Sequence, residues 1–309
     1  CYKLGLEHKT LLWDHEDIKG NLSAVARESR YRLMQNSIPS GAILITGHTL
    51  DDQAETFLMR LRRGSGVDGL ASMSEQSYLS FGNDEMTIFR PLLNFERHTL
   101  KNVLKFHKVD WIEDPTNNDQ SFERVRVRDL LARCVEIGID KSTISQTALL
   151  MQSAKTALNH FASDCYEKFG SCNNGDIIFD FDEFSKQPLD IKRRLISAAQ
   201  KWISNQKYRP RLSQVDGLIN SIDEKITFSG SGTICYFHDN SIRITREVNA
   251  SVCEIKASNG VVFDRRWKLI AIENCKDLTI KCLGETGYTF LEPGIRKKIP
   301  YKTIIALPA

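Results

Sequence analysis

The stretch that most constrains the fold begins with a short apolar run at residues 42–45 and continues through a polar segment into an amphipathic helix. The run is apolar without alternation, which predicts a strand buried on both faces of a parallel sheet. From residue 50, apolar side chains recur at helical spacing along one stripe, and Asp51 and Asp52 lie off that stripe. We therefore place His48 and both aspartates where the carboxyl end of a strand meets the amino end of a helix, which is where open α/β sheets bind ligands.

The order of the predicted elements indicates an α/β fold. A helix after Asn21, the strand at 42–45, the helix from residue 50, a strand at 87–92 and a helix at 96–108 follow one another along the chain. This alternation predicts a doubly wound parallel sheet of the Rossmann-like type.

The composition shifts near residue 135, where we place a domain boundary. Residues 136–220 have helical periodicity, and residues 226–244 contain strand-like runs around Asp239-Asn240, which predict a β-hairpin. We therefore expect three parts: an α/β domain at 1–135, a helical domain with a β-hairpin at 136–250, and a small β-rich C-terminal region at 251–309.

Composition excludes several classes of protein. With 309 residues and 41% hydrophobic content, the chain can bury a sizeable core. Its 42 basic and 39 acidic residues give a net charge of only +3, so any affinity for nucleic acid must come from local clusters. The eight cysteines include no CxxC pair, which argues against a zinc site or a disulfide framework. No apolar run of about 18 residues occurs, so we expect a cytoplasmic protein without a membrane span.

The acidic residues at the start of the helix from residue 50 have two interpretations. Asp51, Asp52 and Glu55 complement the helix macrodipole, with Thr49 as the N-cap, which is a purely structural role. Alternatively, these carboxylates and the imidazole of His48 hold the ribose or base of a nucleotide, or a magnesium ion on its phosphates. The residues alone leave both interpretations open.

Basic residues gather in three segments, and the planar fork of arginine suits phosphate geometry. In the second segment arginine alternates with valine, and Arg124 and Arg128 share a face if that segment is helical. The third segment, residues 191–211, contains no acidic residue and interleaves Trp202 with its cations, so we expect it to face RNA. A solvated surface is the alternative for each segment. The cations are Arg60, Arg62 and Arg63 in the first segment; Arg124, Arg126 and Arg128 in the second; and, among others, Lys192, Arg193 and Arg194 in the third.

Residues 64–69 match the GxGxxG pattern of dinucleotide-binding folds. That fingerprint requires a strand before it and a helix that opens at it. Here a predicted helix precedes it, so Gly64 is interpreted as the glycine that ends this helix, and a nicotinamide cofactor is not expected.

Several motifs taken together closely resemble the tRNA(Ile)-lysidine synthase family. Residues 27–31 are similar to the family's arginine–tyrosine helix, and residues 122–128 to its arginine-rich segment. The order and spacing are highly specific, and the strong match covers roughly residues 20–132. The motifs that carry the resemblance are His48-Thr49-Leu50-Asp51-Asp52-Gln53-Ala54-Glu55-Thr56, Arg62-Arg63-Gly64-Ser65-Gly66-Val67-Asp68-Gly69-Leu70, Arg90-Pro91-Leu92-Leu93 and Trp111-Ile112-Glu113-Asp114-Pro115-Thr116-Asn117.

This resemblance implies a fold of the PP-loop ATPase type and a ligase of the N-type PP-loop ATP pyrophosphatase group. Such an enzyme uses ATP and Mg²⁺ to adenylate the C2 oxygen of the cytidine at the first anticodon position of a CAU-bearing tRNA(Ile), and then joins free lysine to form lysidine. It implies that Asp52, aided by Asp51 and Glu55, orients the substrates or the magnesium ion. A homodimer is also compatible with the resemblance. The implied contacts are His48, Arg30 and Arg63 to ATP, and Arg27, Arg124, Arg126, Arg128, Lys192, Arg193 and Arg194 to tRNA or phosphate.

Two departures from the family pattern affect these expectations. The serine-glycine-glycine-x-aspartate-serine motif that cradles pyrophosphate does not occur in residues 1–309, and Val125 stands where the family commonly has asparagine. We therefore expect either a fragment whose PP-loop lies upstream of Cys1 or a degenerate protein, with reduced activity of this chain alone. The alternatives are a non-catalytic tRNA-binding module and another PP-loop tRNA-modifying enzyme such as a thiolase, although the lack of CxxC argues against a thiolase.

Overall fold

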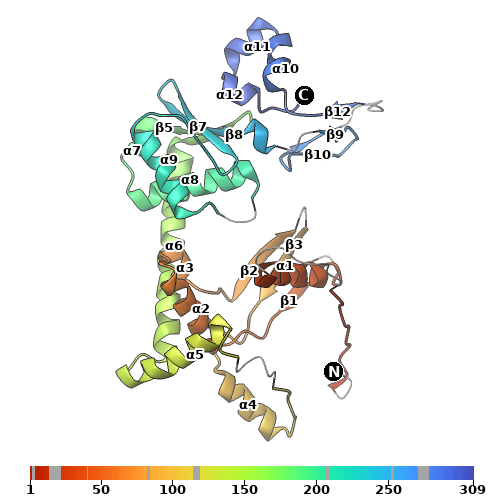
Figure 1. Ribbon diagram of the computed structural model, residues 1–309, viewed down its shortest axis with the longest axis vertical. Helices are drawn as coiled ribbons and strands as arrows, with labels where there is room; N and C mark the ends of the chain where they lie inside the picture. Colours follow the sequence, from red (N-terminus) through yellow and green to blue (C-terminus); the bar gives the residue numbers. More distant parts are fainter. Residues whose placement is uncertain are drawn as a thin grey trace. The chain divides into compact units, whose positions relative to one another are not determined.

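The computed structural model describes residues 1, 4–13, 22–39, 41–81, 84–113, 119–206, 209–251, 254–270 and 278–309. The chain divides into two compact units, Cys1–Lys155 and Thr156–Ala309. Helix α6 (Lys141–Phe169) begins in the first unit and ends in the second (Figure 1). Because the division falls inside this helix, the domain boundary near residue 135 stays a prediction.

The first unit contains a three-stranded sheet with the strand order β1-β3-β2. β1 (Ile43–Ile45) runs parallel to β3 (Asp84–Phe89), and β3 pairs antiparallel with β2 (Gln76–Phe81). The expectation of a wholly parallel sheet is corrected here, because β2 and β3 are close neighbours along the chain and form an antiparallel pair. The other elements of this unit are α1 (Leu22–Gln35), α2 (Leu50–Arg62), α3 (Val67–Leu70), α4 (Arg97–Phe106), α5 (Glu123–Cys134) and the 3-10 turn η3 (Val135–Ile137).

Two apolar clusters hold the first unit together. The first lies between α1 and the sheet, which α1 crosses in Figure 1, and centres on Tyr31, Met86 and Ile88. The second joins α2, α5 and the start of α6. Its buried members are Ala54, Phe57, Val127, Leu131, Ile144 and Ala148.

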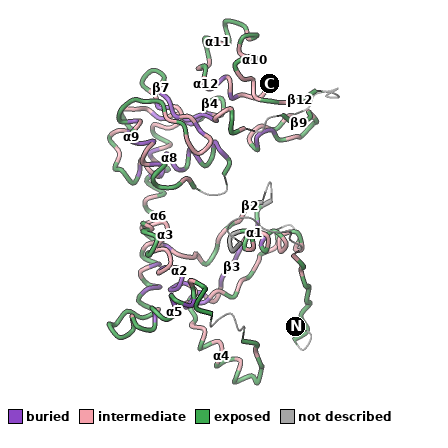
Figure 2. The backbone as a smooth tube through the Cα atoms, in the orientation of Figure 1, coloured by how far each residue is buried: buried purple, intermediate pink, exposed green. Residues whose placement is uncertain are grey.

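The strand β1 is exposed on one face. Ile43 is 60% exposed and Ile45 is 65% exposed, whereas Leu44 packs into the cluster under α1. Figure 2 shows how buried, intermediate and exposed residues are distributed along the backbone. Successive side chains of a strand point to opposite faces, and the described part of the chain covers only the face that carries Leu44. The expectation that this strand is buried on both faces is therefore wrong.

Other local predictions for the first unit are confirmed. Gly64 has φ +68 and follows the end of α2, so it is the glycine at the end of a helix. The segment at 122–128 forms the start of α5, where Val125 and Val127 are buried. The helix expected at 96–108 is α4. Part of the motif at 111–117 lies outside the described residues.

The second unit is built on a five-stranded antiparallel sheet with the order β4-β5-β8-β7-β6. A large apolar core joins this sheet to two helices, α8 and α9. The expected hairpin is confirmed: His238 of β7 is opposite Ser241 of β8, and Asp239 in the turn has φ +54. The elements are β4 (Gly170–Asn173), β5 (Asp176–Asp180), α7 (Phe181–Ser185), α8 (Leu189–Ser204), α9 (Leu212–Asp223), β6 (Phe228–Gly230), β7 (Thr233–His238), β8 (Ser241–Arg246) and the 3-10 turn η4 (Val248–Ala250).

The strands β4 and β5 were not predicted, because residues 136–220 were interpreted as helical. They form a hairpin around Asn174-Gly175, whose φ values of +51 and +78 suit a tight two-residue turn. Asn-Gly next to the apolar run at 177–179 is a strong sequence signal for a hairpin, and it could have identified this one.

The C-terminal region is β-rich only in part. The four strands in the part of this region that the structure describes are two residues long, and residues 284–304 form short helices instead. Pro293 at the first position of α11 favours helix initiation, because its fixed φ suits the first turn. The elements are β9 (Ile255–Lys256), β10 (Val262–Phe263), β11 (Trp267–Lys268), β12 (Thr279–Ile280), α10 (Gly284–Phe290), α11 (Pro293–Lys298) and α12 (Tyr301–Ile304).

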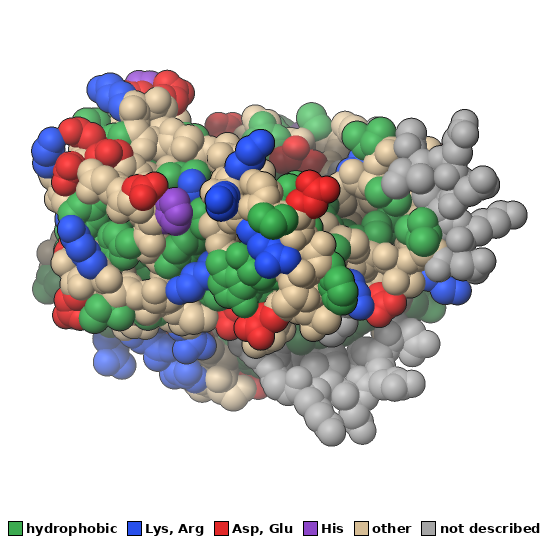
Figure 3. Space-filling model, turned by 90° about the horizontal axis from the view of Figure 1, so that it is seen from above, with side chains coloured by type: hydrophobic (Ala, Val, Ile, Leu, Met, Phe, Trp, Pro, Cys, Tyr) green, Lys and Arg blue, Asp and Glu red, His purple; other side chains and the backbone are tan. Residues whose placement is uncertain are grey.

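The surface carries charges of both signs. Figure 3 shows lysine and arginine side chains mixed with acidic ones on the face that it draws, in keeping with the net charge of +3. The cysteines that the structure describes form no disulfide. Among the described residues, no helix combines the length and the apolar character that crossing a membrane requires.

Candidate active site

The candidate site lies where β1 and β3 end. The two strands are parallel, so their carboxyl ends adjoin, and the Thr46 backbone N–H extends the pairing by donating to the Phe89 carbonyl oxygen at 2.9 Å. His48 follows β1, and its Nδ1 lies 2.8 Å from the hydroxyl oxygen of Thr46. Arg90 follows β3. This is the predicted junction of a strand end and a helix start.

Asp52 is confirmed as part of the helix cap. One of its carboxylate oxygens accepts hydrogen bonds from the Thr49 backbone N–H at 2.9 Å and from the Thr49 hydroxyl at 2.8 Å. Its other oxygen lies 3.3 Å from the Arg97 guanidinium. The structural interpretation therefore explains the position of one carboxylate oxygen of Asp52. The other oxygen faces the guanidinium of Arg97.

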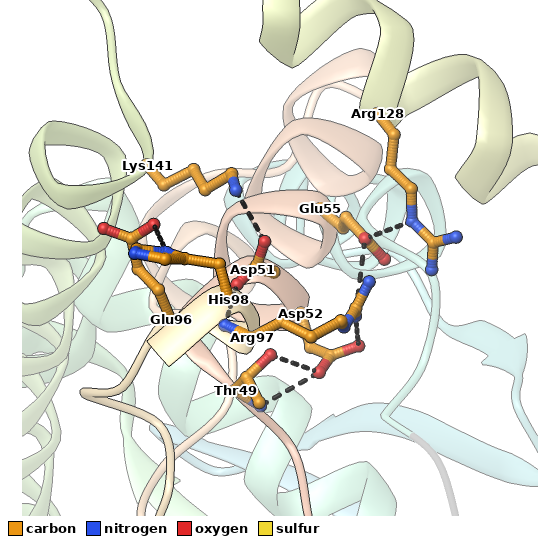
Figure 4. A network of polar contacts seen from close by, with 9 residues as sticks. All are labelled: Thr49, Asp51, Asp52, Glu55, Glu96, Arg97, His98, Arg128 and Lys141. Carbon is orange, nitrogen blue, oxygen red and sulfur yellow. Dashed lines mark hydrogen bonds and ion pairs between the residues drawn. The ribbon is translucent and has the colours of Figure 1, made fainter. Parts of the chain in front are cut away.

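Asp51 joins α2 to the first residues of two other helices. One carboxylate oxygen accepts a hydrogen bond from the Arg97 backbone N–H at 2.7 Å, and the other accepts one from the Lys141 ammonium at 2.6 Å (Figure 4). Burial by itself raises the pKa of Asp51, but these two donors outweigh it, so the pKa lies below its usual 3.8. Asp51 is therefore an ionised anchor at neutral pH.

Glu55 is the most deeply buried acid of the site, with 1% of its side chain exposed. Arg128 of α5 donates to it at 2.6 Å, and Arg97 and Arg124 lie at 3.9 and 4.0 Å. Its Oε2 is buried and has no hydrogen-bond partner among the described residues. Because a buried carboxylate needs cationic or hydrogen-bonding partners, Glu55 draws arginines from two helices toward α2.

Arg97 and Lys141 are site residues that the sequence interpretation missed. Arg97 is the first residue of α4, and Lys141 is the first residue of α6. A cation is unfavourable at a helix amino end unless an anion is near, because it opposes the macrodipole. Two helices that begin with a cation are therefore a sequence signal for an external acidic partner, and here that partner is Asp51.

His48 lies among cations. Burial lowers its pKa below 6.5; Asp52 acts in the opposite direction, and the charges of Arg90, Arg27 and Arg124 lower it further. The imidazole is thus neutral at pH 7. The charges of Arg27 and Arg124, both predicted phosphate contacts, therefore both influence the imidazole of His48.

Other predicted cations of the first unit have partners on the surface. Arg63 contacts Glu123 at 2.9 Å, and Arg126 donates to the carbonyl oxygens of Gln120 and Ser121 at 2.7 and 2.9 Å. Arg27 and Arg30 of α1 lie over the ring of Tyr31 at 5.1 and 5.5 Å. The structure does not bring Arg63 or Arg126 to the three acids, and their assigned roles stay predictions.

The predicted tRNA contacts on α8 belong to the second unit, and acidic residues from outside the segment lie next to them. Arg193 forms a bidentate pair with Asp216 at 2.7 and 2.9 Å, and Arg194 is buried and donates to Asp190 at 3.1 Å. Lys192 lies 3.9 Å from Asp223. In the sequence, the positive charges of this segment have no acidic residues among them, because two of the acids that lie next to them come from α9. A role for these cations in RNA binding stays a prediction.

The acids fit a magnesium ion only together with a ligand. The described residues contain no group of three or more His, Cys, Asp or Glu that could hold a metal. Mg²⁺ is usually bound by one or two carboxylates together with substrate phosphates. The Asp52 oxygen that faces Arg97 is a suitable hard donor, so the residues present fit a phosphate-bound ion and not a protein-only metal site.

Comparison with known proteins decides the family. Residues 1–134 match the family model of the PP-loop domain. The chain is 32% identical to the tRNA(Ile)-lysidine synthase of Ruegeria pomeroyi over 99% of its own length and 72% of that protein. It is 37% identical to the tRNA(Ile)-lysidine synthase of Wolbachia pipientis wMel over 96% of its own length and 68% of that protein. The chain belongs to the tRNA(Ile)-lysidine synthase family.

Membership in the tRNA(Ile)-lysidine synthase family corrects one expectation. Reduced activity was expected because one short pyrophosphate-binding motif does not occur in the sequence. The PP-loop domain as a whole is present, because its model matches residues 1–134. The match also supports the Rossmann-like α/β class for the first unit.

Proposed function

We propose that this protein is an ATP-dependent ligase that joins free lysine to the cytidine at the first anticodon position of a CAU-bearing tRNA(Ile). Family membership supports the reaction class. The observation that carries the proposal is the cluster of Asp51, Asp52 and Glu55 on one turn of α2, beside the carboxyl end of β1. Each of these acids contacts a cation from another element, so the cluster is charged and positioned by tertiary contacts.

The proposed reaction has two steps. The C2 oxygen of the cytidine attacks the α-phosphorus of ATP, and pyrophosphate leaves. The ε-amine of lysine then attacks C2, the C2–O bond breaks, AMP leaves with that oxygen, and the amine loses a proton. Adenylation turns a poor leaving group into a good one, so the protein chiefly has to position its substrates and stabilise phosphate charge.

The charges of the site suit this division of labour. Asp51 is balanced by Lys141, and Glu55 by Arg128. Arg27 and Arg124 are both exposed and act on His48, so they provide positive charge for phosphate oxygens beside a neutral imidazole. The amino groups of free lysine match the acidic cluster, where an incoming ammonium would compete with the cations already bound.

Asp52 is the residue that we propose to hold a magnesium ion, through the carboxylate oxygen that faces Arg97. When bound with ATP, this ion would supply positive charge that stabilises the phosphates. Asp52 would orient this ion, while Thr49 fixes the other oxygen of the same carboxylate by two hydrogen bonds.

The test uses Asp52→Asn. An asparagine keeps an oxygen that accepts from Thr49, so α2 remains capped, but the negative charge is lost. With ATP, labelled lysine and CAU-bearing tRNA(Ile), we expect lysidine formation to fall by at least about 100-fold, the scale on which removal of one preorganised charged group acts, with unchanged tRNA affinity. Asp180→Asn is the control, because Asp180 is the N-cap residue of α7 in the second unit and its carboxylate also accepts a backbone N–H at a helix start, here that of Glu183 at 2.9 Å.

The outcomes separate this proposal from a non-catalytic tRNA-binding module. A module would bind tRNA indifferently to ATP and lysine, and its binding would weaken with salt through counterion release. Absence of lysidine with the unsubstituted protein, or equal activity of Asp52→Asn, would overturn the ligase proposal.

A further inference from the structure

The second unit contains a pocket of about 710 Å³ at the carboxyl end of α8. Its volume lies within the range of sites for small ligands. We name it the Trp202 pocket. It is lined by Cys172, Gly175, Ala198, Lys201, Trp202, Asn205, Gln206, Arg209, Arg265, Arg266 and Trp267.

Close packing fixes the walls of the Trp202 pocket. Gly175 has φ +78, and a Cβ added to it would lie 2.6 Å from Cζ2 of Trp267, so the β4–β5 turn lies against this indole. The Asn205 side chain donates to the Arg265 backbone carbonyl oxygen at 2.7 Å. The end of α8 is thereby tied to the turn between β10 and β11. A pocket whose walls are already held in place costs little ordering when a ligand binds.

The lining of the Trp202 pocket is cationic and contains no acidic residue. Arg266 lies 3.1 Å from Asp264, but this carboxylate also holds Arg246 at 2.9 Å, so one anion serves two guanidinium groups. Among the described residues, the side chains of Lys201 and Arg265 contact no acid. The pocket therefore has excess positive charge and suits an anion.

Trp202 provides a flat apolar surface beside these charges. It is 52% exposed, whereas Ile203 next to it on α8 is fully buried, so the indole lies on the outer side of the helix. Exposing a tryptophan forfeits the hydrophobic stabilisation of a large side chain. Aromatic faces next to a basic groove are what proteins use to bind unpaired nucleotides, because each base can stack on them.

We propose that the Trp202 pocket binds one unpaired nucleotide of an RNA, with the base stacked on Trp202 and the flanking phosphates held by Lys201 and Arg265. The identity of this RNA as the substrate tRNA rests on the proposed function, but the recognition of a nucleotide does not. Of the segment at residues 191–211, the proposal selects Lys201 and Trp202, and not the cations at 192–194 that acidic side chains accompany.

The experiment measures binding of a short, fluorescein-labelled single-stranded oligoribonucleotide to the whole protein by anisotropy. This probe carries no anticodon and needs neither ATP nor lysine, so its binding is independent of lysidine formation. We expect Trp202→Ala to weaken binding by about 5- to 150-fold, the range for loss of one stacked base. Lys201→Gln and Arg265→Gln should each weaken it and reduce its salt dependence.

Matched controls come from the same unit. Phe290 is an exposed aromatic residue of α10, and Lys256 is an exposed lysine of β9. Phe290→Ala and Lys256→Gln should bind the probe like the unsubstituted protein. Thermal unfolding of every variant shows whether a change in binding has a cause in folding.

Three results would overturn the proposal. The first is equal binding by the Trp202, Lys201 and Arg265 variants and the unsubstituted protein. The second is displacement of the probe by AMP at the probe's own affinity, which would make the pocket a site for free mononucleotides. The third is binding of an acidic peptide that is as tight and as dependent on Trp202 as binding of the oligoribonucleotide.

Discussion

Glu55 shows how one residue can organise a site. Only 1% of its side chain is exposed, and its partners on α4 and α5 are distant in sequence, with Arg128 at 2.6 Å. A buried carboxylate without cations would be costly, so each arginine that approaches Glu55 also fixes its own helix relative to α2.

Glu55→Gln tests this role in stability. The substitution removes the charge that Arg128 contacts, and we expect the free energy of unfolding to fall by about 1.5–3 kcal/mol, the value of a hydrogen bond to a charged group. Urea unfolding measures it. Glu113→Gln is the control, because Glu113 has a similarly short contact with Lys101 at 2.5 Å but is exposed. Exposed pairs contribute little, so no measurable change is expected there. Equal effects of the two substitutions would contradict the burial argument.

His48 has a pH dependence that follows from its surroundings. Its folded pKa is below the unfolded value of 6.5, so its contribution to stability is fully present above pH 6.5 and is lost as pH falls through the folded pKa. An NMR titration should give a pKa below 6.5. Arg124→Gln should raise this pKa and Asp52→Asn should lower it further, because each removes the charge that acts on the imidazole. A pKa of 6.5 or more in the unsubstituted protein would contradict this account.

At the scale of elements, several contacts between helices and strands depend on the first residue of a helix or on a turn. Asp51 accepts hydrogen bonds from the first residues of α4 and α6, and Gly175 lets the β4–β5 turn approach Trp267. In both cases one small feature determines where a whole element lies.

Gly175→Ala tests the contact between the β4–β5 turn and Trp267. The alanine must adopt φ near +78, and its Cβ would clash with Trp267. We expect a loss of about 2–5 kcal/mol in the free energy of unfolding, the sum of a left-handed residue and an overpacked contact. Gly260 has φ +82 with nothing within 4 Å of an added Cβ, so Gly260→Ala should cost only the backbone part. Urea unfolding followed by tryptophan fluorescence compares them, and equal losses would show that the Trp267 contact is not tight.

At the scale of the whole molecule, each unit has its own apolar core. The core of the second unit joins the five-stranded sheet to α8 and α9, and its members lie from Leu158 onward. We therefore expect a protein of residues 156–309 to fold alone, with cooperative thermal unfolding by circular dichroism and dispersed NMR amide signals. A non-cooperative transition with collapsed amide signals would show that this unit requires the first one.

Local sequence signals predicted much of the fold. The start of α2 and its cap at Thr49 and Asp52, the end of α2 at Gly64 and the β7–β8 hairpin all depend on residues a few positions apart. The family resemblance followed from motif order. The β4–β5 hairpin was missed although Asn174-Gly175 marked it, because helical periodicity on both sides dominated the interpretation.

The sequence by itself determined the strand-to-helix junction and the acids that follow it, because strand ends, caps and helix periodicity are written in neighbouring residues. Only the tertiary structure decided which cations these acids hold and which cations remain available. Asp51 contacts Lys141 across 90 positions, and Arg193 contacts Asp216 from another helix. Such pairs follow from packing of whole elements, and their strength depends on burial, which no local pattern of charge contains.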